Sequence, residues 1–263
     1  MTAAAKPLRG WTVLVPRGGP WGHGVASELR ARGATPIVAP TINFAGTADA
    51  DALSQALTDL QAGRFDWLTV TSATTVDVLS AHGVTLPRET RVAAVGETTA
   101  AALVAAGYRV DVVPREDNSA AGLLAEWAEA TGGTVPLKIL ALRSDIAAPV
   151  LTDGLRATGH DVVSVVAYRT IGVPIDPEVA ASVAEGRVDA ILVTSGSVAA
   201  QIAEQLGPVP ERTVIACIGP RTAGDARAAG LRVDIVARER SAQSLIEALE
   251  ELAAARTGAG RGA

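Results

Sequence analysis

Apolar and polar residues divide this chain into two kinds of segment that alternate from end to end. Short apolar runs, such as WTVLV, KILAL and VDAILV, are separated by longer stretches rich in alanine and leucine. Runs of this length suit buried strands, and the longer stretches suit helices. The alternation predicts a parallel α/β fold. We expect strands at 11–15, 65–70, 91–95, 108–113, 138–142, 161–168, 188–193, 213–218 and 231–236.

Glycine marks the expected ends of the helices, because it takes the left-handed conformation after a helix without a steric penalty. The glycines in these positions are Gly33, Gly83, Gly107, Gly159 and Gly230. After each of them the chain turns into a new apolar run or a short loop that leads to one. The positions of these glycines support the division into alternating helices and strands.

An internal repeat covers most of the chain. VGETTAAALVAAGYRVDVVPRE, residues 95–116, returns 123 positions later as IGPRTAGDARAAGLRVDIVARE, residues 218–239, with twelve of twenty-two residues identical. FDWLTVTSA and VDAILVTSG align at the same offset, and VLVPRGG aligns with ILALRSD at an offset of 126. The repeat predicts two copies of one α/β unit, which usually form two similar lobes on either side of a cleft.

Length and charge narrow the classes of function. The 263 residues suffice for two domains that each bury a core, and 48% hydrophobic residues argue for a folded protein. The net charge of −5 gives no general attraction for nucleic acid or anionic membrane. Any anionic ligand must therefore be bound by local basic groups.

Cysteine and histidine offer no obvious chemistry. Cys217 lies in an apolar run, which favours core packing over a catalytic thiol. His23, His82 and His160 are far apart and form no ligand-spaced cluster, so we expect no metal site. Because His82 and His160 stand beside helix-ending glycines, we expect them to face solvent or the helix C-terminus. No dinucleotide or phosphate-loop motif is present.

The repeated small polar motifs fall where strands pass into helices. Ligands of open parallel sheets bind beyond the carboxyl ends of the strands, where helix N-termini present free N–H groups. We expect Ser72 and Ser195 to be helix N-caps, with Thr99 and Thr222 one turn into the following helices. Ordinary capping explains any one of these residues. Their recurrence in two lobes favours two sets that converge on one ligand.

Taken in order, the motifs resemble those of the uroporphyrinogen-III synthase family. The residues that carry the resemblance are VPRGG, VTSATTV, VGETTAAAL, VVAYRTI, VTSGSV and IGPRTAGDARAAG. Each motif is weak alone, being composed of small residues, and the specificity lies in the ordered set, which spans Trp11 to about Leu252.

The resemblance implies an α/β architecture of two similar flavodoxin-like parallel-sheet domains with a cleft between them. One domain is expected to combine 10–40 with 173–257, and the other to cover 47–163. A two-stranded antiparallel connector, 41–46 and 164–172, would join them, in place of the boundary near 132–133 that the repeat alone suggests. Pro40 and Pro174 bracket the expected crossings. We expect residues 258–263 to form a disordered tail.

The resemblance also implies a reaction, in which hydroxymethylbilane is cyclised to uroporphyrinogen III. The enzyme removes water and inverts ring D through a spiro intermediate, without cofactor or metal, in tetrapyrrole (haem, sirohaem and cobalamin) biosynthesis. Its main task would be control of geometry, since the bilane closes unaided to the uninverted isomer. Tyr168 matches the family's candidate for assisting departure of the hydroxyl. A purely structural role for this tyrosine between the connector strands is equally open.

The expected substrate-binding residues lie at strand ends in both halves of the repeat. Hydroxyl and backbone groups match the family's cleft, and arginines at strand ends or in adjoining loops would meet the eight carboxylates of the substrate. The set is Arg17, Thr71, Ser72, Gly96, Thr99, Arg143, Ser195, Gly196, Ser197, Gly219, Arg221 and Thr222.

Other readings of the sequence remain open at this point. A two-lobed binding or regulatory protein on the same scaffold could hold an anionic small molecule without converting it. A phosphate- or nucleotide-handling enzyme is disfavoured by the missing phosphate loop. For the synthase we expect a cytoplasmic monomer, with transient contact to hydroxymethylbilane synthase and no nucleic-acid or membrane partner.

Overall fold

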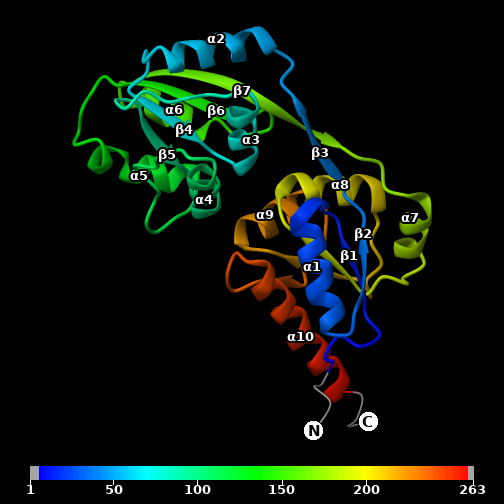
Figure 1. Cartoon of the computed structure of the whole chain (residues 1–263). Helices are drawn as coiled ribbons and strands as arrows, with labels where there is room; N and C mark the ends of the chain where they lie inside the picture. The colour runs from blue at the N-terminus through cyan, green and yellow to red at the C-terminus, as the bar shows by residue number, and fades with distance from the viewer. Residues whose placement is uncertain (1–5, 260–263) are drawn as a thin grey trace. The chain divides into compact units, whose positions relative to one another are not determined.

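Two compact units make up the chain in a computed structural model that describes residues 6–259 (Figure 1). Unit 1 combines the chain up to Asn43 with the chain from Ile171 onward, and unit 2 is Phe44–Thr170. Each unit contains helices and a five-stranded sheet. The predicted α/β class with parallel sheets is confirmed.

The sheet of unit 1 has the strand order β10-β9-β8-β1-β2, and every strand pair in it runs parallel. Its strands are β1 (Thr12–Val15), β2 (Thr35–Val38), β8 (Ala190–Val193), β9 (Val214–Cys217) and β10 (Ile235–Val236). Its helices are α1 (Gly19–Ala31), α7 (Pro177–Ala184), α8 (Gly196–Leu206), α9 (Pro220–Ala228) and α10 (Ala242–Ala259). The sequence analysis missed β2, because Pro36 interrupts its apolar run. Proline is tolerated there since β2 is an edge strand.

Helices cover both faces of the unit 1 sheet. Val25 and Leu29 of α1 and Leu249 of α10 pack with one set of strand side chains. Val198 and Ile202 of α8 lie in a second cluster with the opposite set, together with residues of α7 and α9. The central strands β8 and β9 are therefore buried along their whole length, which explains why their sequences are continuously apolar.

The sheet of unit 2 has the strand order β3-β7-β6-β4-β5. Its strands are β3 (Ile42–Gly46), β4 (Trp67–Val70), β5 (Arg91–Ala94), β6 (Lys138–Ser144) and β7 (Asp161–Gly172). Its helices are α2 (Ala50–Gln61), α3 (Ala73–Ala81), α4 (Glu97–Ala105), α5 (Ala120–Ala130) and α6 (Val150–Ala157). The pairs β7-β6, β6-β4 and β4-β5 are parallel.

Two apolar clusters again lie on opposite faces of this sheet. Leu57 of α2, Leu79 of α3 and Leu103 of α4 pack on one face. Trp127 of α5 and Leu155 of α6 pack on the other. Figure 1 shows these helices around the green and cyan strands of unit 2.

The internal repeat reappears as matching hydrogen bonds in the two units. Asp111 accepts a bond from Val92 N at 2.8 Å, and Asp234, 123 positions later, accepts one from Ile215 N at 2.8 Å. The same offset relates the threonine hydroxyl bonds Thr90–Phe65 and Thr213–Val188, and the ion pairs Arg109–Asp111 and Arg232–Asp234. The strands match as well, with β4 and β5 corresponding to β8 and β9. The duplication thus extends from sequence to the contacts that hold each sheet.

Three details of the sequence analysis need correction. The strand expected at 108–113 is reduced to an isolated parallel bridge between Val112 and Ala93. The strand expected at 231–236 shrinks to the two residues of β10. Helix α10 continues through 258 and 259, which were assigned to the disordered tail, and the rest of that tail lies outside the described residues. In the first two cases the carboxylate of an Arg-x-Asp sequence accepts a backbone N–H of the neighbouring strand.

Among residues 6–259, none of the helices combines the length and apolar character that a membrane span needs.

Candidate functional site

Most candidate residues of unit 2 gather at one edge of its sheet. Strands β6, β4 and β5 are neighbours and run parallel, so their carboxyl ends lie side by side. Arg143 lies near the end of β6, Ser72 follows β4, and Gly96 follows β5. Tyr168 on β7 pairs in register with Ser144, so it joins the same edge. Four neighbouring strands therefore contribute to one row of candidate side chains.

Ser72 and Tyr168 are in direct contact. Ser72 Oγ lies 2.8 Å from Tyr168 OH, and it accepts a bond from Thr75 N at 3.4 Å as the N-cap of α3. The cap expected from sequence is confirmed. Tyr168 is only 6% exposed, and its ring meets the edge of Phe44 at a centroid distance of 5.3 Å. These contacts fix both the ring and the hydroxyl of Tyr168.

Arg143 uses much of its guanidinium within the protein. Its Nε donates to Ser164 Oγ at 3.1 Å, and its Nη1 lies within bonding distance of the carbonyl oxygens of Ser144 and Ala147, at 3.1 and 3.4 Å. The side chain is half-buried. Arg143 therefore holds the loop after β6 in shape, and Nη2 is the part of the guanidinium without a described partner there.

The other candidates of unit 2 belong to the starts of α3 and α4. Thr71 is half-buried in the turn after β4. Gly96 is the N-cap of α4 and has no side chain to bond the helix N–H groups. Thr99 lies one turn in, as expected, but it is 6% exposed and points into a buried environment. The backbone at Gly96, more than the Thr99 hydroxyl, offers donors at this helix start.

Unit 1 repeats the arrangement at the carboxyl ends of β1, β8 and β9. These strands are neighbours in the sheet, and Arg17, Ser195 and Gly219 follow them in turn. Ser195 caps α8 by accepting from Val198 N at 3.3 Å, which confirms the predicted cap. Gly219 caps α9 without a side-chain bond, as Gly96 does in α4.

Arg17 lies beside an aromatic ring in the loop after β1. Its guanidinium carbon is 5.1 Å from the ring centroid of Trp21, a cation–π distance. Although part of the side chain reaches the surface, the surrounding protein removes enough water to lower the pKa of Arg17 from its usual value. Among the residues that the structure describes, no carboxylate forms an ion pair with Arg17. A partly desolvated cation of this kind suits an anionic ligand.

The remaining candidates of unit 1 differ in accessibility. Ser197 Oγ lies 3.0 Å from Ser195 Oγ, so these hydroxyls form a pair. Gly196 lies against α9, since a Cβ there would be 2.6 Å from Asp225 Oδ2. Thr222 is 5% exposed, whereas Arg221 beside it is exposed. Gly196 thus has a packing role, and Arg221 is free to reach a ligand.

The cysteine expected in the core is found there. Cys217 is fully buried in the cluster on the α8 face of unit 1. Burial raises the pKa of its thiol to about 11. The nucleophilic thiolate is therefore disfavoured at neutral pH.

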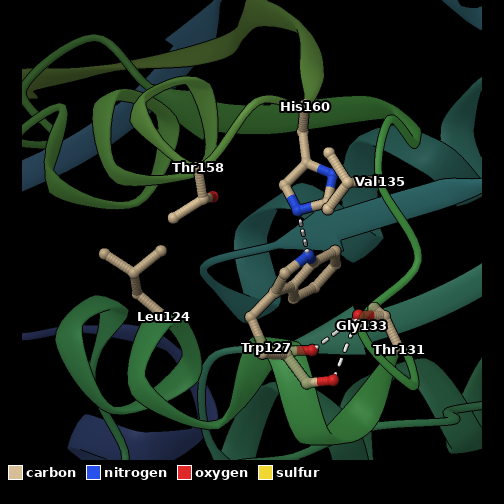
Figure 2. Close-up of a pocket in the computed structure, with 8 residues that line it drawn as sticks. Leu124, Trp127, Thr131, Gly133, Val135, Thr158 and His160 are labelled. Carbon is tan, nitrogen blue, oxygen red and sulfur yellow. Dashed lines mark hydrogen bonds between the residues drawn. The ribbon is translucent and has the colours of Figure 1, made fainter.

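His160 corrects another expectation, because it lies in the interior and not in solvent. It is 8% exposed and accepts a bond from Trp127 Nε1 at 3.1 Å (Figure 2). Its Nδ1 lies 3.2 Å from Leu137 N. Burial lowers the pKa of His160. The position of His160 beside Gly159 gives no indication that Trp127, which is distant in sequence, packs against the imidazole.

A pocket lies beside His160, at the amino ends of β6 and β7. Leu124, Trp127, Val135 and Thr158 line it, as Figure 2 shows, and its volume is about 90 Å³. Sites for drug-sized ligands occupy roughly 300–1,000 Å³. The pocket is therefore too small for a large organic substrate, and it lies at the opposite edge of the sheet from the candidate residues.

Sequence reasoning missed Phe44 and Ser164, which contact Tyr168 and Arg143 respectively. Their motifs are not repeated, and only the fold brings them to these partners. A weak signal existed for Phe44, since it is one of two phenylalanines in the chain.

The fold and the edge residues define a class, that of duplicated parallel α/β proteins with small polar residues at strand ends. Comparison with known proteins identifies the family within this class. Residues 24–247 match the sequence model of the family described as uroporphyrinogen-III synthase HemD. This match covers most of the chain, so the chain belongs to the uroporphyrinogen-III synthase family.

Individual relatives agree with this assignment. The chain is 27% identical to the uroporphyrinogen-III synthase of Synechococcus elongatus over an alignment 267 residues long, and this alignment covers 95% of this chain and 98% of the relative. It is similar in fold to a mutant uroporphyrinogen III synthase from the extremely thermophilic bacterium Thermus thermophilus, with a TM-score of 0.65, 19% identity, and coverage of 94% and 99% of the two chains. The uroporphyrinogen-III synthetase of Helicobacter pylori gives a TM-score of 0.61 at 16% identity, with coverage of 92% and 99%.

Proposed function

We propose that this chain cyclises hydroxymethylbilane to uroporphyrinogen III, with loss of water and inversion of ring D through a spiro intermediate. Family membership supports the reaction. The observation that carries the proposal is the hydrogen-bonded Ser72–Tyr168 pair at a strand edge that also bears Arg143 and two helix N-termini.

Tyr168 is proposed to assist departure of the substrate hydroxyl. As the carbon–oxygen bond breaks, its electron pair stays on the oxygen, which takes a proton from the phenol and leaves as water. Electrons of the pyrrole form the new double bond, and the product is an azafulvenium cation that keeps its N–H. The ring system releases a proton when it closes, and this restores the phenol. Positioned proton transfer of this kind contributes typically 10²–10⁴-fold to a rate.

Control of geometry is proposed to come from groups that bind the eight carboxylates. Arg17, Arg221 and the Nη2 of Arg143 supply charge, and the starts of α4 and α9 after Gly96 and Gly219 supply N–H donors. The hydroxyl candidates complete the set: Thr71, Ser72, Thr99, Ser195, Ser197 and Thr222, with Gly196 as a backbone contact.

The proposal extends to the organisation of the chain. We propose that the two units act as separate domains joined by the segments 41–46 and 164–172. Within unit 1, Val173 N donates to Thr41 O at 2.8 Å, and within unit 2, Arg169 Nε donates to Gly46 O at 3.0 Å. The Arg169 bond ties the two segments together, and the Val173 bond continues the pairing one residue past 172, so both support a paired connector. We further propose a cytoplasmic monomer that receives its substrate through transient contact with hydroxymethylbilane synthase.

The test supplies freshly generated hydroxymethylbilane and separates the oxidised type III and type I products by chromatography. The proposal predicts mostly type III with the wild-type protein and a shift toward type I with Tyr168→Phe and Thr222→Ala. Thr158→Ala serves as the control, because Thr158 follows α6 beside the pocket at the amino ends of β6 and β7, at the opposite edge of the sheet from the candidate residues. Type I product alone from folded wild-type protein would contradict the proposed activity, whereas unchanged Tyr168→Phe and Thr222→Ala variants would contradict the residue assignment.

A further inference from the structure

The hydroxyl of Tyr168 has a defined partner, and this raises the question of which atom gives the proton. Ser72 Oγ lies 2.8 Å from Tyr168 OH, and either could be the donor. Tyr168 carries one phenolic proton. If that proton points to Ser72, it is not available to a leaving group on the substrate. The direction of this bond therefore decides whether Tyr168 can act as an acid.

The start of α3 favours one direction. Thr75 N donates to Ser72 Oγ, at 3.4 Å, so Ser72 already receives one hydrogen and can direct its own toward Tyr168. The positive end of the helix dipole lies at this turn and favours a series of hydrogen bonds whose donors point outward from the helix. Thr75 Oγ1 lies farther from Ser72 Oγ, at 3.3 Å, than Tyr168 OH does. The shorter contact indicates that Tyr168 is the preferred partner.

The duplicated serine of unit 1 shows that capping alone does not require this contact. Ser195, 123 positions after Ser72, caps α8 in the same way, yet its hydroxyl pairs with Ser197. The Tyr168 contact is therefore specific to unit 2. Phe44 packs edge-on against the same ring at an interplanar angle of 87°, so rotation of the phenol is restricted as well.

We infer that Ser72 is a positioning residue, which acts on the substrate by donating a hydrogen bond to Tyr168 and so turning the phenolic proton outward. The inference rests on the proposed function. It replaces direct substrate contact as the main role of Ser72. Thr75 N–H donates to the Ser72 hydroxyl, the Ser72 hydroxyl donates to the Tyr168 hydroxyl, and the Tyr168 hydroxyl donates to the leaving oxygen.

A double-mutant cycle tests this role. Kinetics are measured for Ser72→Ala, Tyr168→Phe and the double variant with generated hydroxymethylbilane. We expect Ser72→Ala to lower kcat about tenfold, the size of one lost hydrogen bond, with KM nearly unchanged. The double variant should be no slower than Tyr168→Phe alone, because Ser72 has nothing left to act on.

Two further variants separate positioning from helix capping. Ser72→Thr keeps a hydroxyl and a favourable N-cap, so it should retain most of kcat. Thr158→Ala removes a side-chain hydrogen bond from the end of α6, at the opposite edge of the sheet, and should leave kcat and the isomer ratio unchanged. If the Ser72→Ala protein does not fold, the Ser72→Thr variant decides, and a tenfold loss in folded Ser72→Thr would overturn the inference.

The outcomes distinguish this inference from the proposed function. Wild-type protein that releases only type I product refutes both. If wild-type protein makes type III product but the losses of the two single variants multiply in the double variant, Ser72 acts independently of Tyr168 and only the inference fails. A raised KM with unchanged kcat in Ser72→Ala would likewise show direct substrate binding.

Discussion

Gly22 in α1 packs against the backbone of Arg17, so Gly22→Ala tests both the packing of this helix and the position of Arg17. An added Cβ at Gly22 would lie 1.9 Å from the carbonyl oxygen of Arg17 and 2.9 Å from its carbonyl carbon. Real Cβ atoms essentially never approach within 3.0 Å of another heavy atom. The neighbour is backbone and cannot rotate away. The helix or the Arg17 turn must therefore move by about 1 Å.

The size of the effect follows from two opposing contributions. Overpacking of this kind costs about 1–3 kcal/mol, and contact with backbone places Gly22→Ala near the upper end. Alanine is favoured over glycine in a helix by about 1 kcal/mol. The net expectation is a loss of about 2 kcal/mol in the free energy of unfolding of unit 1. For a protein of this size, that lowers Tm by about 4–8 °C.

Gly24 provides a matched control in the same helix. A Cβ at Gly24 would meet no heavy atom within 4 Å, so Gly24→Ala keeps the propensity gain without the clash. Thermal unfolding followed by circular dichroism should show Gly22→Ala below the wild type and Gly24→Ala about 2–4 °C above it. Displacement of Arg17 should also lower kcat/KM of Gly22→Ala at least about tenfold. Equal Tm values for the two variants would refute the packing argument.

Three further predictions concern buried groups. Thr69 Oγ1 is buried without a hydrogen-bond partner among the described residues, so Thr69→Val should raise the free energy of unfolding by about 1 kcal/mol in urea titrations, and a loss of stability would show an overlooked partner. Because burial raises the pKa of Cys217 to about 11, a thiol reagent at pH 8 should label it only after denaturant is added; rapid labelling of the native protein would contradict the assignment. The pKa of His160 is lowered from 6.5 by burial, so below pH 6.5 the unfolded chain binds a proton at His160 while the folded protein keeps the imidazole neutral. The contribution of neutral His160 to the free energy of unfolding is complete above pH 6.5 and is lost as pH falls toward the folded pKa. Between pH 7.5 and 5 the free energy of unfolding should therefore fall more for the wild type than for His160→Gln. Equal pH dependence of the two proteins would exclude this role.

The sequence predicted the elements whose signals are local. Continuous apolar runs gave β4, β8 and β9, since buried central strands need no polar alternation. The caps Ser72 and Ser195 were predictable because capping depends on residues within one turn.

Features that depend on distant partners could not be predicted in the same way. His160 looked like a residue at a helix end, but Trp127, from another helix, encloses it. The role of Arg143 depends on Ser164 in the adjacent strand and on the carbonyls of its own loop. The edge strand at 108–113 shortened because the carboxylate of Asp111, in place of a backbone carbonyl, accepts the hydrogen bond from Val92 N. Local composition carries no information about these neighbours.

The central claim is the proposed binding of the substrate by strand-end residues of each unit, and hydrogen exchange with bound product tests it most directly. Exchange is measured by mass spectrometry with and without uroporphyrinogen III kept reduced. The account predicts slower exchange in the turns at 71–75 and 96–99 of unit 2 and at 195–198 and 219–222 of unit 1. Protection in only one unit, or confined to the residues around His160 and Trp127, would contradict it.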